Sequence, residues 1–223
     1  MGAIPLRQDI IYPESDGQPL GETDVHISEV LDLLETLRDW YRDQSDVYVA
    51  GNLFLYYVEG NPRAVVCPDL FVAKGVPKYF RRTYKLWEEG TSPCMVIEVT
   101  SRDTHREDTV GKRACYEELG IEEYFLHDPL GDYLDPPLRG FRLIQGRYVP
   151  IKPDPDGSLS SLTTGLRLRL DDAGLRLVDA ATGEFLLRGQ EARDQVRRER
   201  AAREAAEDEL ARLRRELKRR TDR

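Results

Sequence analysis

The sequence predicts an α/β fold, with a mixed sheet flanked by helices, because strand and helix patterns alternate through its centre. Apolar runs of strand length at residues 65–73 and 94–100 are followed by a helical stretch at residues 104–119 and a third apolar run at residues 124–126. A strand, a helix and a strand within about 35 residues make a βαβ unit, so we expect the outer strands to pair in parallel. Beyond Pro129, short strand-like segments between turns rich in Gly, Asp and Pro indicate a β-rich extension.

Length and composition limit the classes of protein that fit. A chain of 223 residues allows one large domain and a tail, and an apolar content of 40% is enough for a hydrophobic core. The formal net charge of −8 argues against a protein that coats polyanions with its whole surface. A local basic groove is still compatible with that charge.

Cysteine usage and the apolar runs indicate the compartment. Cys67, Cys94 and Cys115 are odd in number and form no CxxC pair, which predicts buried free thiols in a reducing cytosol and hence a cytoplasmic protein. The first nine residues lack the apolar core of a signal peptide. No apolar run approaches the length of a membrane span, so we expect no membrane partner.

The N-terminal third is expected to hold an arm, a helix and a bent strand region. Residues 1–24 are rich in Pro, Gly and Asp, which indicates an irregular arm. Ser28 is expected to cap a helix that runs to about Asp43, because apolar residues recur there at helical spacing. Residues 47–58 are rich in β-branched and aromatic side chains and predict two strands, or one bent strand with a tight turn.

A polar connection follows the strand that carries Asp69. It spans residues 75–92 and contains Arg81, Arg82 and Lys85 among aromatic residues. Cations interleaved with aromatic rings are typical of single-stranded nucleic-acid contacts. A solvated loop explains the same residues, and the acidity of the chain slightly favours that alternative.

The second helix is expected to begin at Asp103 or Thr104 and to end near Leu119, because Gly120 follows in the position that glycine favours after a helix. Short strands are then expected within the extension, at Phe141–Ile144, Tyr148–Ile151, Leu166–Leu170, Leu175–Val178 and Phe185–Leu187.

The C-terminal segment, residues 189–223, is predicted to form a long helix. From residue 190 onward it lacks Pro and Gly and carries a net charge of +3, against −11 for the rest of the chain. Leu210, Leu213 and Leu217 form an apolar seam in its last half, whereas a coiled coil needs three or four clean heptads. A dimeric coiled coil and a solvated single helix are equally compatible with this pattern.

Two acids within apolar strands provide the strongest functional signal. A carboxylate such as Asp69 or Glu98 is costly in such a run unless it is paired or binds a metal. Mg²⁺ prefers one or two carboxylates together with water and substrate oxygens. Lys112, on the following helix, is placed to orient a water or to stabilise developing charge. The pattern predicts phosphodiester hydrolysis that depends on Mg²⁺ or Mn²⁺.

Each of these three residues also has a structural explanation. Asp69 follows Pro68 and can cap a turn at the start of a strand. Glu98 can pair with a buried Arg113. Lys112 can be a surface charge, as helical lysines usually are.

The sequence gives weaker evidence for a role of other acids and of the histidines in this site. Asp108 is either an additional ligand or a first-turn helix charge. Glu29, or Glu22, near the first helix is a candidate for a further acid. The histidines share no metal-ligand spacing and are expected to be structural or exposed; they are His26, His105 and His127.

The pair Pro68-Asp69, followed by Glu98-Val99-Thr100, resembles the PD-(D/E)XK nuclease superfamily. The finer pattern is similar to the Uma-type family of proposed restriction endonucleases, formerly a domain of unknown function. Its matching parts are residues 47–53, 68–72, 96–101 and 122–129 with Asp108, Lys112, Arg113 and Tyr116.

This resemblance covers roughly residues 20–185, and it implies a restriction-endonuclease-like domain at residues 25–188. It also implies a divalent-metal site with Asp69 and Glu98 as ligands, and it leaves Lys112 as the candidate lysine. Thr100 departs from the superfamily pattern, because a lysine is usual two residues after the glutamate. The lysine role must therefore move to Lys112, or the activity is altered or absent.

The function expected from these observations is metal-dependent endonuclease cleavage of DNA. Dimerisation through the C-terminal helix would bring together the two sites that double-strand cleavage requires. One alternative is a catalytically inactive nucleic-acid- or protein-binding module on the same fold, with the C-terminal helix mediating interaction. A hydrolase of small phosphoesters is a further alternative.

Overall fold

The structure is a computed structural model that describes residues 10–15, 17, 23–101, 104, 107–172 and 174–221. The chain divides into two compact units, Met1–Leu186 and Leu187–Arg223. We refer to the first as the body and to the second as the tail. The predictions for Glu22, Asp103 and His105 concern residues outside the described parts.

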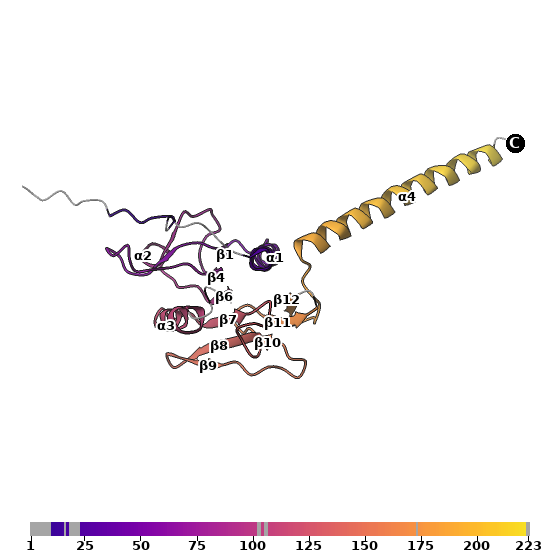
Figure 1. The fold of residues 1–223 in the computed structure, drawn as a ribbon. Coiled ribbons are helices and arrows are strands. Elements are labelled where there is room, and N and C mark those ends of the chain that lie inside the picture. Colours follow the sequence, from indigo (N-terminus) through magenta and orange to yellow (C-terminus); the bar gives the residue numbers. More distant parts are fainter. Residues whose placement is uncertain are drawn as a thin grey trace, which may run out of the picture. The chain divides into compact units, whose positions relative to one another are not determined.

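A six-stranded mixed sheet forms the centre of the body (Figure 1). In spatial order its strands are β1 Val47–Gly51, β4 Leu70–Lys74, β6 Met95–Val99, β7 Glu123–His127, β8 Leu138–Ile144 and β9 Arg147–Pro150. Strands β6 and β7 pair in parallel, with Glu98 opposite Leu126, and all the other neighbours are antiparallel. The predicted α/β fold and its parallel strand pair are confirmed.

Helix α1, Asp24–Trp40, packs on one face of this sheet. The Thr23 side chain accepts a hydrogen bond from the His26 backbone N–H at 3.3 Å and so caps the helix. Val30, Leu33 and Leu37 recur at helical spacing and are buried against the sheet. A second, antiparallel sheet contributes to the same core; its strands are β10 Leu159–Ser160, β11 Leu166–Asp171 and β12 Gly174–Asp179.

The opposite face is covered by a helical segment and a small sheet. The segment consists of a π-helical turn, η1 Glu107–Lys112, which continues into helix α3, Arg113–Glu118. The small sheet has the order β3-β2-β5, and its strands are β3 Val65–Val66, β2 Leu55–Tyr56 and β5 Tyr84–Lys85, followed by the short helix α2 Leu86–Glu89. Tyr116 of α3 and Tyr84 of β5 are buried in a second hydrophobic cluster, which lies on this face of the sheet.

The end of α3 follows directly from Gly120. The N–H of Ile121 bonds the Tyr116 carbonyl, and the N–H of Gly120 bonds the Glu117 carbonyl. This is a Schellman motif, which requires a left-handed residue after the helix, and Gly120 has a φ of 72°. The stop predicted at Gly120 therefore matches the structure, and the chain turns at once into β7.

Three predicted boundaries were wrong. Helix α1 begins at Asp24, because Thr23 rather than Ser28 caps it, and it ends at Trp40. The second helical stretch is π-helical before Arg113. In the predicted strand Phe185–Leu187, only Phe185 forms an isolated bridge, with Val178. The region 47–58 does contain two strands.

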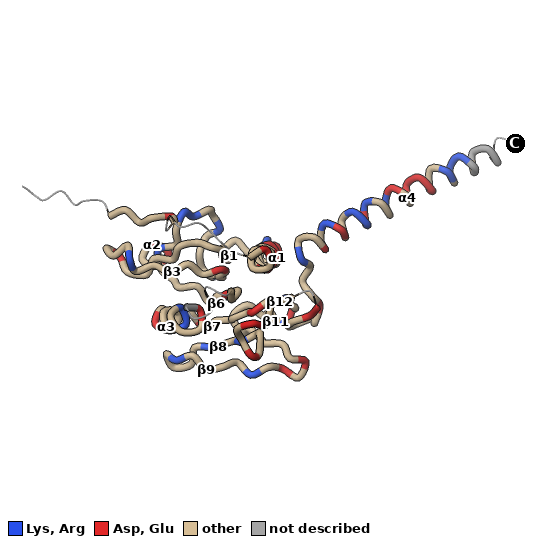
Figure 2. Tube along the Cα trace, viewed as in Figure 1, with Lys and Arg blue, Asp and Glu red and all other residues tan. Residues whose placement is uncertain are grey.

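The tail is one long helix, α4 Gly189–Thr221, as its composition predicted. Opposite charges alternate along it (Figure 2). Ion pairs at helical spacing join Arg200 to Glu204 and Arg203 to Glu207. No helix in the described parts of the chain combines the length and apolarity that a membrane crossing needs.

The cysteines form no disulfide with one another. Cys94 is buried, whereas Cys67 and Cys115 are only partly buried. The expectation that all three are buried was therefore wrong for two of them.

Candidate active site

Glu98 is the most enclosed acid of the candidate site. It lies on β6 and is 0% exposed. The Tyr116 hydroxyl donates a hydrogen bond to its Oε1 at 2.5 Å, and the Lys112 ammonium donates one to Oε2 at 2.8 Å. Burial raises the pKa of Glu98 well above its ordinary value, the charge of Lys112 opposes this shift, and Asp69 and Asp108 add to it.

Asp69 lies beside Glu98 at the start of the neighbouring strand β4. Its backbone N–H donates to Oε2 of Glu98 at 3.3 Å, and its own Oδ2 accepts a hydrogen bond from the N–H of Val99 at 2.8 Å. Nε2 of His26 lies 3.3 Å from the same Oδ2. Burial disfavours the ionised form, but the hydrogen bond with His26 and the charge of Lys112 outweigh it, so the pKa of Asp69 is lowered.

The π-helical turn supplies a third acid and the lysine. Asp108 is 0% exposed, and its Oδ1 lies 3.1 Å from Nζ of Lys112. Burial raises the pKa of Asp108, and Lys112 opposes that shift. Burial alone would lower the pKa of Lys112, but Glu98, Asp108 and Asp69 together raise it. Lys112 is therefore a protonated ammonium at neutral pH.

The three predicted residues Asp69, Glu98 and Lys112 thus lie together, and Asp108 joins them. Among the described residues, three carboxyl groups share one lysine and the His26 ring, so these residues supply less positive than negative charge. Burial is the main cause of the raised pKa values of Glu98 and Asp108, and the charge of Asp69 adds to both. An added cation would relieve this imbalance.

The residues present fit a hard divalent cation. Oδ1 of Asp69 makes no hydrogen bond with any described residue, and the side chain retains 13% exposure. The Thr100 hydroxyl, two residues beyond Glu98, is buried and has no hydrogen-bond partner in the described parts of the chain. Such an orphaned oxygen indicates a missing water or ion.

The protein does not supply a complete ligand cage. Among the described residues, no three His, Cys, Asp or Glu side chains converge in an arrangement that would hold a metal alone. Mg²⁺ sites usually combine one or two carboxylates with waters and substrate oxygens. Asp69 and Glu98 match that smaller requirement.

Glu29, the further acid predicted near the first helix, contacts Leu175 and His127. Its Oε2 accepts a hydrogen bond from the N–H of Leu175 at 3.3 Å and lies 3.5 Å from Nε2 of His127. A side chain at Gly174 would clash with it, since a Cβ there would lie 2.1 Å from Oε1 of Glu29. These contacts connect α1 to the start of β12 and to the end of β7.

The three predicted nucleic-acid cations have protein partners. Nε of Arg81 lies 2.7 Å from Glu89 in a pair that is almost fully buried. Its guanidinium also covers the Tyr48 and Tyr79 rings, at 4.1 Å and 3.9 Å from their centroids. This contact orders the loop before β5.

Of the other two cations, Arg82 is exposed and Lys85 is half-buried. Arg82 pairs with Glu14 at 2.5 Å, and its side chain is 82% exposed. Lys85 pairs with Glu88 at 3.0 Å.

The sequence did not reveal the role of His26, which we expected to be structural or exposed. Its contact with Asp69 joins residues 43 positions apart. The one available signal was its spacing from Glu29, which places both side chains on one face of a helix. Arg113, the alternative partner for Glu98, lies over the Phe141 ring instead.

The fold and the cluster of acids and lysine at the end of its central strands define a nuclease-like α/β protein. The model of the Uma2 family, described as "Putative restriction endonuclease", matches residues 4–173. The chain belongs to this family, which confirms the resemblance seen in its motifs.

One similar solved structure is a "putative nuclease belonging to DUF820" from Anabaena variabilis. It shares 14% sequence identity with a TM-score of 0.48, over 64% of this chain and 75% of that one. A comparison with curated proteins found no match.

Proposed function

We propose that the protein is an endonuclease that hydrolyses DNA phosphodiester bonds with Mg²⁺ or Mn²⁺, and that Asp69 and Glu98 hold the metal. The observation that carries the proposal is the buried cluster of three carboxyl groups around one lysine. Membership of the Uma2 family supports nuclease chemistry at this cluster. When bound, the divalent ion would polarise the phosphoryl oxygen and activate a water.

The protein's own residues have separable roles in this proposal. Lys112 stays protonated because acids surround it, so it stabilises negative charge on the phosphoryl group and does not act as a base. Tyr116 fixes the rotamer of Glu98 through Oε1. His26 keeps Asp69 ionised and oriented.

In this proposal Lys112, on the helical segment after β6, replaces the lysine that the superfamily pattern has at the position of Thr100. The ammonium of Lys112 reaches Glu98 at 2.8 Å although the strand itself carries no lysine. This contact supports retained catalysis over loss of the lysine function.

One observation favours the alternative of a non-catalytic binding module. Both oxygens of Glu98 already have protein partners, Tyr116 and Lys112, so the glutamate is satisfied without a metal. In this alternative the site is a structural ion-pair network, and α4 mediates interaction.

The tail supports a homodimer in our proposal. Val196, Leu210, Leu213 and Leu217 are exposed along α4, each by at least 44%. Pairing of two such helices would bury these side chains and bring two bodies onto one DNA duplex.

Plasmid cleavage with Mg²⁺ or Mn²⁺ tests the proposal. We expect nicking or linearisation by the wild type, and loss of at least a hundredfold in Glu98→Gln and Asp69→Asn, by analogy with the removal of other transition-state-stabilising groups, which costs roughly 10²–10³. Glu88→Gln is the matched control, since Glu88 is an exposed acid paired with Lys85. Metal binding by calorimetry without any cleavage would select the binding module.

A further inference from the structure

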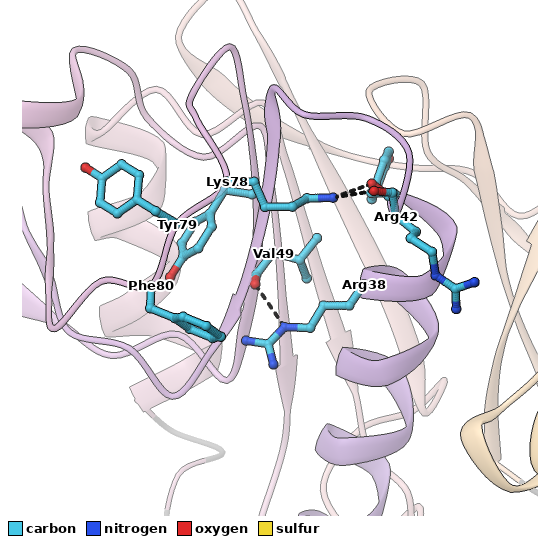
Figure 3. A pocket seen from close by; sticks show the side chains of 8 residues that line it. Arg38, Arg42, Val49, Lys78, Tyr79 and Phe80 are labelled. Carbon is cyan, nitrogen blue, oxygen red and sulfur yellow. Dashed lines mark hydrogen bonds between the residues drawn. The ribbon is translucent and has the colours of Figure 1, made fainter.

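A second candidate site lies at the other end of α1. A cavity of about 420 Å³ is lined by Arg38, Tyr41, Arg42, Tyr48, Val49, Lys78, Tyr79 and Phe80 (Figure 3). Its volume is within the range of small-molecule sites, about 300–1,000 Å³. Among the described residues that line it, three are cations and none is an acid, although the chain outside the tail is strongly acidic.

The cations of this pocket differ in what they can offer a ligand. Nζ of Lys78 donates to the carbonyls of Tyr41 and Arg42, at 2.5 Å and 3.1 Å, and so caps the end of α1. Arg42 pairs with Asp39. Arg38 uses only Nε, which donates to the Val49 carbonyl at 3.3 Å.

The two terminal nitrogens of Arg38 have no hydrogen-bond partner in the described parts of the chain. Since Nε is held on β1, the guanidinium is fixed in place with its outer edge available. Such a planar fork binds phosphate or carboxylate in a bidentate manner. Figure 3 shows that the side chains of Arg38 and Phe80 both line this cavity.

Phe80 supplies an aromatic face next to that fork. Its side chain is 98% exposed, and the neighbouring Tyr79 is 54% exposed. The loop is nevertheless held, because Lys78 bonds the end of α1 and Arg81 stacks on Tyr79. An ordered, exposed ring beside an open guanidinium offers stacking and anion binding at once.

We propose that this pocket binds one nucleotide unit, with the base stacked on Phe80 and the phosphate on Arg38. The inference rests on the proposed function in taking the substrate to be nucleic acid. Arg38 follows His26 by twelve positions on α1, so the pocket lies about 18 Å along the helix from the acid cluster. That span corresponds to about five stacked nucleotides, so the pocket would hold substrate remote from the cleaved bond.

Binding of fluorescein-labelled oligothymidylate to the full chain in EDTA, followed by anisotropy, tests this site without cleavage. Phe80→Ala should weaken binding about tenfold, as the loss of one stacked base does. Because Phe80 is almost wholly exposed, this change leaves folding intact. Leu162→Ala, which also truncates an exposed apolar side chain, is the control and should bind as the wild type does.

The phosphate contact is tested by salt dependence. Arg38→Gln should reduce the slope of log K against log[salt] by about 0.7, the value for one phosphate contact on a single strand. Arg38→Lys should restore the slope. Arg147→Gln, which removes an exposed cation on β9, is the control and should leave it unchanged.

Competition distinguishes the source of the nucleotide. Thymidine monophosphate is added as a competitor to the wild type and to Phe80→Ala. If it displaces the oligonucleotide only from the wild type, the pocket binds free nucleotides as well as a strand. Wild-type affinity in Phe80→Ala, or displacement by dextran sulfate equal to that by unlabelled oligonucleotide, would overturn the proposal.

The pocket and the endonuclease proposal can fail separately. If plasmid cleavage depends on Glu98 but oligonucleotide binding does not depend on Phe80, only the pocket is rejected. Phe80-dependent binding without cleavage would reject the endonuclease alone.

Discussion

Lys112 is the cation that two buried acids share within the described part of the chain. It contacts Glu98 at 2.8 Å and Asp108 at 3.1 Å, and neither acid is exposed. Lys112→Ala should lower the free energy of unfolding by about 3 kcal/mol at pH 7, because removal of one partner leaves buried charge uncompensated. Urea denaturation measures this change.

Lys85→Ala provides the comparison for that experiment. Lys85 pairs with Glu88, which is well exposed, and the loss should stay near 0.5 kcal/mol. If the two variants lose the same free energy of unfolding, removal of Lys112 does not leave uncompensated buried charge, and the prediction is wrong.

The acids of the site should also couple metal binding to pH. Burial raises the pKa of Glu98 and Asp108 in the folded chain. Folded acids of this kind hold protons that the unfolded chain releases, so the contribution of these two acids to the stability of the metal-free protein falls as pH rises above about 4.5. A bound cation displaces those protons, so Mn²⁺ should raise the melting temperature more at pH 8 than at pH 5.5.

Thermal shift measurements at fixed Mn²⁺ concentration check this expectation. A shift that is independent of pH, or one that persists in Asp69→Asn, would place the metal elsewhere.

Some residues of the site could be predicted from the sequence, and others could not. Asp69 and Glu98 were identifiable because each acid interrupts an apolar run, which is a local pattern. The contacts of His26 with Asp69 and of Arg38 with Val49 depend on how α1 lies on the sheet. Nothing in the neighbouring sequence encodes that placement.

At the level of elements, Glu123 joins the central sheet to the segment before β11. Burial opposes its ionisation, but hydrogen bonds from Ser161, Leu162, Thr163 and Arg142 outweigh burial and lower its pKa. An acid with a lowered pKa stabilises the fold above its unfolded pKa of about 4.3 and loses that effect as pH falls through its folded pKa. Glu123→Gln should therefore cost about 2 kcal/mol at pH 7 and progressively less in acid.

Urea midpoints measured from pH 7 downward test this prediction. Glu122→Gln is the adjacent control, because Glu122 is exposed, and it should show little change at any pH. A pH-independent loss in Glu123→Gln would point to packing rather than charge.

Elements with a regular pattern were predictable, and those set by side-chain contacts were not. Strands β4 and β6 appear as apolar runs because both of their faces are buried. The start of α1 was misplaced because Thr23 and Ser28 are both acceptable caps, and only the packing of His26 and Glu29 selects Thr23. No sequence pattern distinguished the π-helical turn from an ordinary helix.

At the scale of the whole chain, the body and α4 form separate compact units. A chain ending at Arg188 should keep the free energy of unfolding of the body, measured in urea, within about 0.5 kcal/mol of that in the full chain, since changes away from packed contacts have small effects. In our proposal it should also change from dimer to monomer in sedimentation equilibrium. The full chain is the reference, and a monomeric full chain would remove the role assigned to α4.

Lys112 lies on a different element from Asp69 and Glu98, the two proposed metal ligands, and this separation has a consequence for inactivation. Asp69 and Glu98 belong to strands in the middle of the sheet, whereas Lys112 and Tyr116 belong to one short helical segment. That segment can detach while the sheet stays paired, since local opening requires less free energy than global unfolding. In our proposal, heating should therefore abolish DNA cleavage some degrees below the melting temperature of the body, and cooling should restore cleavage without refolding of the strands.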